Sequence, residues 1–226
     1  AQVLHSAGIP FELVKTGRFR HVQVRGDRPE IPGSGEKVLI AHYDRVPGAP
    51  GANDNGASVL ALVDYLRLPR QKSGLRVVFT DGEELGPGGQ AADQGAGLFP
   101  GVLDMTGIGD TVVLGHLGEE LIRKTRSETR PTDLDDYART RLGARRWLAT
   151  CGAGDALEVN TPFSDDLGLF LAGIPAVQVS LLPKKEALAY RKGGALPPSW
   201  RTMHTAEDKP ETLWPGSRPL VAELLA

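Results

Sequence analysis

The stretch KVLIAHYD, residues 37–44, begins as an apolar run and ends in polar residues that include a histidine and an aspartate. Its apolar part, 38–41, shows no alternation with polar residues, which is typical of a strand covered on both faces of a sheet. The stretch LRVVFTDGEE, residues 75–84, has the same plan with an acidic end. Between the two, Gly56–Leu66 carries apolar residues at helical spacing. A strand, a helix and a second such strand predict a βα unit with parallel strands.

The remaining elements continue this alternation of strands and helices. Phe11–Lys15 and His21–Arg25, joined across Thr16-Gly17, predict an opening hairpin or edge pair. Further strands are expected at Gly101–Met105, Thr111–Leu114 and Ala176–Leu182, and further helices at Leu117–Arg126, Leu134–Trp147 and Pro210–Leu225, the last with a break near Pro215-Gly216. No repeat or linker interrupts the chain, so the sequence predicts one domain over residues 1–226. Its fold class is α/β, with three layers and a mostly parallel central sheet flanked by helices.

Composition argues against several classes of partner. The net charge of −2 offers no electrostatic reason to bind nucleic acid or an anionic membrane surface. No apolar run approaches the roughly 20 residues that cross a bilayer, so membrane insertion is not expected. The chain begins at Ala1 without a basic-then-apolar leader, and we expect that any export signal was removed or never present; the compartment stays open. Cys151 is the only cysteine, which excludes an intrachain disulfide, and it is expected to be a small buried residue.

Candidate metal ligands lie where predicted strands end and in two loops. A histidine follows the apolar run of KVLIAHYD, paired glutamates end LRVVFTDGEE, and an aspartate follows the apolar residues of GVLDM, residues 101–105. Ligands of open parallel sheets bind outside the carboxyl ends of the strands, so these side chains should meet at one edge. The loops are GANDNG, residues 51–56, and RTMHT, residues 201–205. The predicted ligands are His42, Asp54, Glu84, Asp104 and His204.

These residue types suit zinc, which accepts imidazole nitrogen and carboxylate oxygen. Two histidines and three carboxylates suffice for two zinc ions if one carboxylate bridges them, and a single zinc is the alternative. Asp54 is the natural bridge, because its glycine-rich loop lets the backbone approach closely.

Glu83 and Asp44 are expected to act beside the metal. Neighbouring side chains of an extended chain point to opposite sides, so Glu84 can bind the metal while Glu83 faces the water that the metal activates. A carboxylate in that place can act as general base, since zinc lowers the pKa of water to roughly 7. Asp44, two residues after His42, is placed to orient the imidazole.

Each feature alone has an ordinary structural explanation. The acidic turn 81–84 could be solvated, His42 could be a satisfied core residue, and Asp104 could cap the next turn. Their joint placement is what favours a site. No Gly-x-Ser-x-Gly elbow supports a serine hydrolase. The other histidines are expected at the surface or in the core: His5, His21 and His116. A group of arginines is expected on a solvated helix face: Arg139, Arg141, Arg145 and Arg146.

The sequence resembles peptidase family M28, the bacterial zinc aminopeptidases and glutaminyl cyclases. The matching stretches are VLIAHYDRVPGAPGANDNGAS (38–58), VVFTDGEELG (77–86), VLDMTG (102–107), SDDLGLFLAGIPAVQVS (164–180) and MHTAED (203–208). The resemblance implies that His42 and Asp104 bind one zinc, that Glu84 and His204 bind the other, and that Asp54 bridges them. It further implies that Glu83 is the general base and that the substrate is a peptide with a free N-terminus, from which N-terminal residues are removed.

Several departures from the family pattern keep alternatives open. The segment after Glu84, GPGGQAADQGAG (86–97), is short and rich in glycine, and the N-terminal helical region is abbreviated. Asp166 stands where the family often has a histidine. One alternative is a glutaminyl cyclase with a single zinc on Asp54, Glu84 and His204, although such cyclases carry tryptophan where this chain has Met203. The other alternative is a catalytically silent member of the fold.

Overall fold

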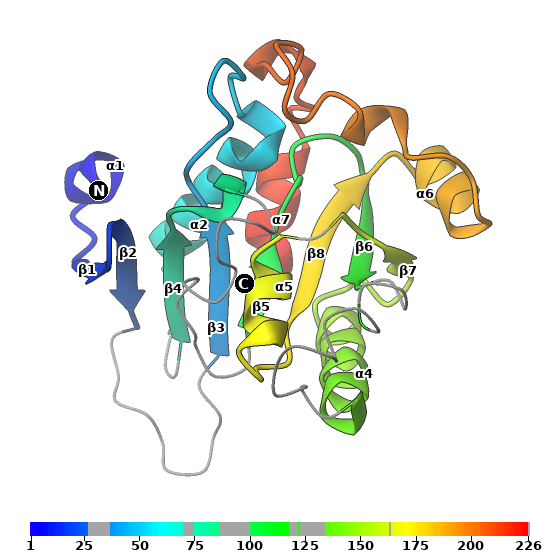
Figure 1. Ribbon diagram of the computed structural model, residues 1–226, viewed down its shortest axis with the longest axis horizontal. Helices are drawn as coiled ribbons and strands as arrows, with labels where there is room; N and C mark the ends of the chain where they lie inside the picture. The colour runs from blue at the N-terminus through cyan, green and yellow to red at the C-terminus, as the bar shows by residue number, and fades with distance from the viewer. Residues whose placement is uncertain are drawn as a thin grey trace.

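The computed structural model describes residues 1–26, 37–69, 75–85, 100–117, 122, 134–162 and 164–225. Within them it forms one eight-stranded sheet in the order β1-β2-β4-β3-β5-β8-β6-β7 (Figure 1). The strands are β1 Glu12–Thr16, β2 Phe19–Arg25, β3 Lys37–His42, β4 Leu75–Thr80, β5 Pro100–Leu103, β6 Thr111–His116, β7 Leu157–Asn160 and β8 Val177–Leu182. The helices are α1 Gln2–Ser6, α2 Ala57–Arg67, α4 Leu134–Thr150, α5 Asp165–Leu171, α6 Lys184–Arg191 and α7 Ser217–Leu225.

The centre of the sheet is parallel. β3 pairs with β4 and β5, and β5 pairs with β8, all in the same direction. Antiparallel pairs flank this centre, β1 with β2 and β2 with β4 on one side and β8 with β6 on the other, where β7 runs parallel to β6. The predicted α/β class is confirmed, with a mixed sheet whose centre is parallel and whose carboxyl ends share one edge.

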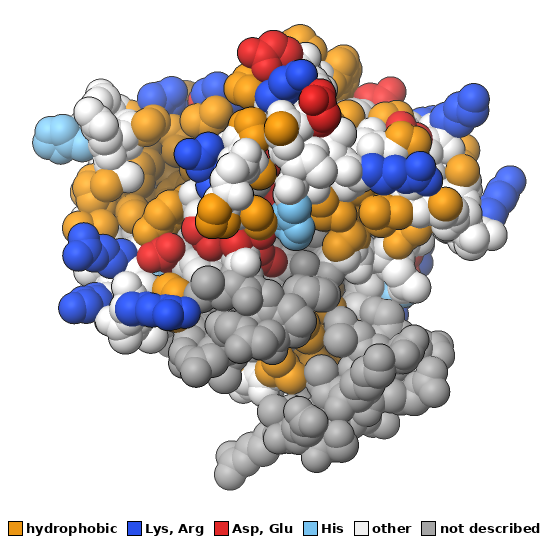
Figure 2. Space-filling view, turned by 45° about the horizontal axis from the view of Figure 1, so that its top comes forward, with side chains coloured by type: hydrophobic (Ala, Val, Ile, Leu, Met, Phe, Trp, Pro, Cys, Tyr) orange, Lys and Arg blue, Asp and Glu red, His pale blue; other side chains and the backbone are white. Residues whose placement is uncertain are grey.

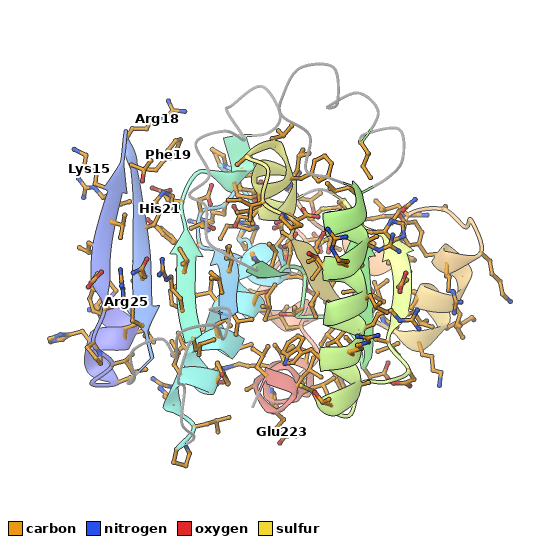
Figure 3. All side chains as sticks on the ribbon, turned by 90° about the horizontal axis from the view of Figure 1, so that it is seen from below. Lys15, Arg18, Phe19, His21, Arg25 and Glu223 are labelled. Carbon is orange, nitrogen blue, oxygen red and sulfur yellow. The ribbon has the colours of Figure 1, made fainter. Side chains whose placement is uncertain are left out.

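Strand β3 shows why its apolar run is continuous. Val38 and Ile40 pack on one face in a cluster with Leu169 of α5. Leu39 and Ala41 face the opposite side and join the main core, which includes residues of α2 and α7. Figure 3 shows α5 and α7 on opposite faces of the sheet. A strand with helices on both faces needs apolar residues at successive positions, as the sequence indicated.

The opening hairpin is confirmed. Its register pairs Thr16 with Phe19, and Gly17 turns the chain at a φ of +57°, which glycine adopts without strain. Lys15 and Arg18 point away from the molecule at the hairpin tip, whereas His21 of β2 is buried (Figure 3).

Some predicted elements differ from the structure. In the expected helix Pro210–Leu225, the break near Pro215-Gly216 is confirmed: α7 follows it, and the part before it is only a short turn, Pro210–Thr212. The elements α1, α5, α6 and β7 were not predicted, since all are short. The helix expected at Leu117–Arg126 lies almost wholly outside the described residues. Cys151 was expected to be buried but is only partly so, at the edge of the main core. None of the described helices has the length and apolar character needed to cross a bilayer.

Candidate metal centre

The predicted ligands meet at the carboxyl edge of the parallel strands. His42 is the last residue of β3 and pairs in register with Thr80, the last residue of β4. The turn Glu83–Leu85 follows β4 directly, and Asp104 follows β5. Figure 2 shows acidic side chains gathered on this face beside a histidine. Their meeting follows from topology, because strands that run in parallel end at the same edge.

One group of potential ligands surrounds the buried ring of His42. Its Nε2 lies 3.1 Å from Oδ1 of Asp54 and 3.7 Å from Oδ1 of Asp104. All three side chains are almost inaccessible to solvent. Their ligand atoms lie close enough together to hold one metal ion.

A second group lies on the other side of Asp54. Oδ2 of Asp54 is 3.3 Å from Nε2 of His204, and Oε2 of Glu84 is 3.1 Å from the same nitrogen. These atoms also lie within reach of one ion. His204 adopts a φ of +62°, an uncommon conformation for a residue with a side chain. The structure therefore brings all five predicted ligands together, and Asp54 lies between the two groups.

Asp44 contacts one residue of each ligand group. Its backbone oxygen lies 3.3 Å from Nδ1 of His42, in position to accept a hydrogen bond that leaves Nε2 free. Its Oδ2 accepts a hydrogen bond of 3.1 Å from the backbone N–H of Glu84. The role of Asp44 in orienting the imidazole stays a prediction.

The donor set fits a cation. Nε2 of His42 and Oδ1 of Asp104 are buried and have no hydrogen-bond partner among the residues that the structure describes, so two ligand atoms are left without a bond there. Both atoms belong to residue types that zinc accepts, and the second oxygen of Asp104 is held by Nε2 of Gln178 at 3.0 Å. A ligand carboxylate oriented by a further hydrogen bond is common around metals.

The raised pKa values of the clustered carboxyl groups also favour a bound cation. Burial raises the pKa of Glu83 to about 9, and the charges of Asp104, Asp165 and Asp54 add to this against the opposing effect of His42. Burial and the charge of Asp54 also raise the pKa of Glu84, to about 7. Carboxylates packed this closely are poorly ionised unless a positive charge lies among them, which a bound metal ion supplies.

Burial lowers the pKa of His42, but its contacts with three carboxylates outweigh this effect and raise the pKa well above its usual value. The three are Asp104, Asp44 and Asp54. In the metal-free protein, these carboxylates therefore favour the protonated form of the imidazole. A metal ion would displace the proton.

The sequence analysis gave no role to several residues that hold the site. Thr80 donates a hydrogen bond of 2.5 Å from Oγ1 to Oδ2 of Asp165, a buried carboxyl whose pKa burial raises to about 6. Asp166, which stands where the family often has histidine, is also buried, and burial raises its pKa to about 7. The position of Asp165, beside Ser164 at the start of a helix, is a sequence signal that could have indicated a role in the site. Gln178 carries no such signal, since it lies within an apolar strand.

An apolar groove of about 350 Å³ is lined by residues of α1, α2 and the strands β1, β2 and β4, and none of the candidate ligands is among its lining residues. Tyr43, which follows His42, is part of its lining and donates a hydrogen bond of 2.5 Å to the backbone oxygen of Arg20. Other lining residues are Leu13, Val22, Val59, Val63 and Phe79. Its volume lies in the range of small-ligand sites.

Comparison with known proteins supports the resemblance to peptidase family M28. Residues 26–97 match the model of that family. No curated protein matches the sequence. Among solved structures, the glutaminyl cyclase of Tannerella forsythia is similar over 100% of this chain and 85% of its own, with 17% identity and a TM-score of 0.62. The glutaminyl cyclase of Porphyromonas gingivalis is similar over 99% of this chain and 84% of its own, with 17% identity and a TM-score of 0.60.

A zinc aminopeptidase of Bacillus subtilis is similar over 91% of this chain, with 20% identity and a TM-score of 0.58. This chain spans 49% of that aminopeptidase. At these identities the likeness shows a shared fold. The fold is therefore that of zinc aminopeptidases and glutaminyl cyclases, in agreement with the predicted family.

Proposed function

We propose that the chain is a zinc-dependent aminopeptidase that removes N-terminal residues from peptides with a free amine. The observation that carries the proposal is the shared use of Asp54. Its Oδ1 faces His42 and its Oδ2 faces His204. Each side has a further carboxylate, Asp104 or Glu84. Two sets of histidine and carboxylate that share one aspartate suit a pair of zinc ions.

The chemistry needs one positioned base. Zinc, when bound, supplies a Lewis acid that polarises a carbonyl oxygen and lowers the pKa of water. Glu83 is the base in this proposal: its Oε2 lies 3.9 Å from Nε2 of His42. Glu83 could also bind a metal ion together with His42 and Glu84, but the two ligand groups that share Asp54 do not include it. It takes a proton from the attacking water at a carboxylate oxygen and delivers it to the leaving amine. Positive charge nearby lowers the pKa of Glu83 from its raised value, so that it can act as a base near neutral pH.

Recognition of the substrate follows from charge. An acidic cluster attracts the positive amine at the N-terminus of a peptide.

The glutaminyl cyclase alternative needs only Asp54, Glu84 and His204, which also lie together. Two observations favour hydrolysis over cyclisation. His42 and Asp104 are present, buried and aimed at Asp54, which a single-zinc site does not require. The indole of Trp200 is completely buried and packs edge-on against Tyr190, so it cannot take the place of the tryptophan that cyclases carry before their last histidine.

The test uses short peptides and zinc-loaded protein. We expect release of N-terminal residues from peptides with a free amine and no cleavage of the same peptides after acetylation. Conversion of glutaminyl peptides to pyroglutamyl peptides, without release of amino acids, would transfer the assignment to the cyclase. Neither reaction at saturating zinc would favour the catalytically silent fold.

A further inference from the structure

The loop that carries Asp54 is held from two sides by different residues. On one side, Nδ2 of Asn55 donates a hydrogen bond of 2.8 Å to the backbone oxygen of Leu103. Oδ1 of Asn53 accepts a hydrogen bond of 2.7 Å from the backbone N–H of Gly107. Both bonds are buried and reach the segment of Asp104. The neighbours of Asp54 thus hold the loop to the first group of ligands.

On the other side, Asp208 holds the same loop. Its Oδ1 accepts a hydrogen bond of 2.7 Å from the backbone N–H of Asn53, and its Oδ2 accepts one of 3.1 Å from the backbone N–H of Asp54. Its backbone oxygen accepts a third, of 3.1 Å, from the N–H of Ala52. Hydrogen bonds from N–H groups to a buried carboxylate are stronger than those between neutral groups.

Asp208 belongs to the segment that supplies His204. The two residues are four positions apart, and the backbone N–H of Asp208 donates to the oxygen of Thr205 at 3.2 Å, which closes the segment into a turn. The side chain of Asp208 has no exposed surface, so it is not available to a substrate. Of the three ligands in the second group, Asp54 and His204 therefore depend on contacts of this one turn.

We propose that Asp208 is a positioning residue for the second metal position, which Asp54, Glu84 and His204 form. The first position, which His42, Asp54 and Asp104 form, is held together separately. The inference rests on the proposed zinc centre. Asp208 joins two of the three ligand segments of the second position. Among the described residues of the first position, Asp208 bonds the Asp54 loop alone. Asn53 and Asn55 already tie this loop to the segment of Asp104.

The experiment measures zinc binding at each position alone. Asp104→Ala leaves the second position, and His204→Ala leaves the first. Asp208→Asn is then added to each variant, because asparagine keeps the size but turns one acceptor into a donor that faces a backbone N–H. Zinc affinity is measured by competition with a chromophoric chelator, and the melting temperature of the zinc-free protein is measured alongside.

In the Asp104→Ala background we expect Asp208→Asn to weaken zinc binding by about 10–100-fold, as is typical when a residue that orients a ligand is lost. In the His204→Ala background we expect a much smaller change. The matched control is Glu207→Gln, an exposed neighbour whose side chain pairs with Lys209; it should leave zinc affinity unchanged in both backgrounds. If Asp208→Asn folds poorly, Asp208→Glu is measured as well. It keeps both acceptor oxygens and should therefore restore part of the zinc affinity that Asp208→Asn loses.

Equal weakening in both backgrounds, or a lower melting temperature with zinc affinity unchanged, would overturn the inference and leave Asp208 as a general structural contact. That result is distinct from failure of the proposed function. Wild-type protein that binds zinc and cleaves peptides retains the proposed function even if Asp208 proves dispensable. If the wild-type protein binds no zinc, both the proposed function and the inference about Asp208 are wrong.

Discussion

The backbone N–H of Glu84 donates a hydrogen bond to Oδ2 of Asp44, forty residues earlier in the chain. This bond ties the turn after β4 to the segment after β3. The backbone oxygen of Asp44 lies within hydrogen-bond distance of Nδ1 of His42. Asp44 therefore positions one residue from each group of ligands, and Glu83 lies in the turn that it holds.

We expect Asp44→Ala to weaken zinc binding by about 10–100-fold, because the turn of Glu84 and the ring of His42 lose their common support. Asp44→Asn keeps an acceptor for the N–H of Glu84 and should lie between the wild type and Asp44→Ala. Zinc affinity measured by calorimetry on the three proteins checks this order. Equal affinities would show that Asp44 does not position the ligands.

The second prediction concerns Asp54. Because its two oxygens face different histidines, Asp54→Ala should empty both metal positions, whereas His204→Ala should empty one. Zinc per chain in purified protein, measured by atomic emission, tests this. The bridge assignment is wrong if Asp54→Ala retains one tightly bound zinc.

The third prediction concerns Glu83. Glu83→Gln preserves shape and removes the base, so turnover should fall by about 10²–10⁴-fold while zinc content stays near that of the wild type. Glu84→Gln is the contrasting variant and should lower zinc content itself. Hydrolysis of an aminoacyl reporter and zinc content are measured on both variants. Wild-type turnover in Glu83→Gln would exclude it as the base.

The fourth prediction concerns pH and the metal-free protein. Burial raises the pKa of Asp165 to about 6, of Asp166 to about 7 and of Glu84 to about 7, so the folded state keeps protons that the unfolded state releases above about pH 4. The raised pKa of His42 acts in the same direction. Its contribution to stability is complete below the unfolded value near 6.5 and falls as pH rises from there toward the raised pKa of the folded protein. The stability of the metal-free protein should therefore fall between pH 5 and pH 8.

Zinc should reverse this trend, because its ligands must be deprotonated and binding strengthens as pH rises. The increase in melting temperature on adding zinc should be larger at pH 8 than at pH 5, where protons compete for His42 and the carboxylates. Thermal melts at both pH values, with and without zinc, measure it. A zinc effect that is larger at pH 5 would contradict the account of the cluster.

The sequence determined the elements that carry the first ligands. The apolar runs of β3 and β4 are long enough, and unbroken enough, to predict buried parallel strands, and α2 has clear helical spacing between them. Once these strands are parallel, His42 and the turn of Glu83 must lie at one edge, since parallel strands end together. His42 and Glu84 could be predicted as candidate ligands for this reason.

Only the tertiary structure decided how those ligands are held. Gln178 bonds Asp104 across 74 positions of the chain, and Asp208 bonds the Asp54 loop across about twice that separation. Such pairs leave no periodic signal, because hydrogen bonds between distant segments depend on where the backbone places each donor and acceptor. The left-handed conformation of His204 is likewise a property of the folded turn. Local hydrophobic spacing specifies strands and helices, whereas the orientation of a buried side chain depends on all the segments packed around it.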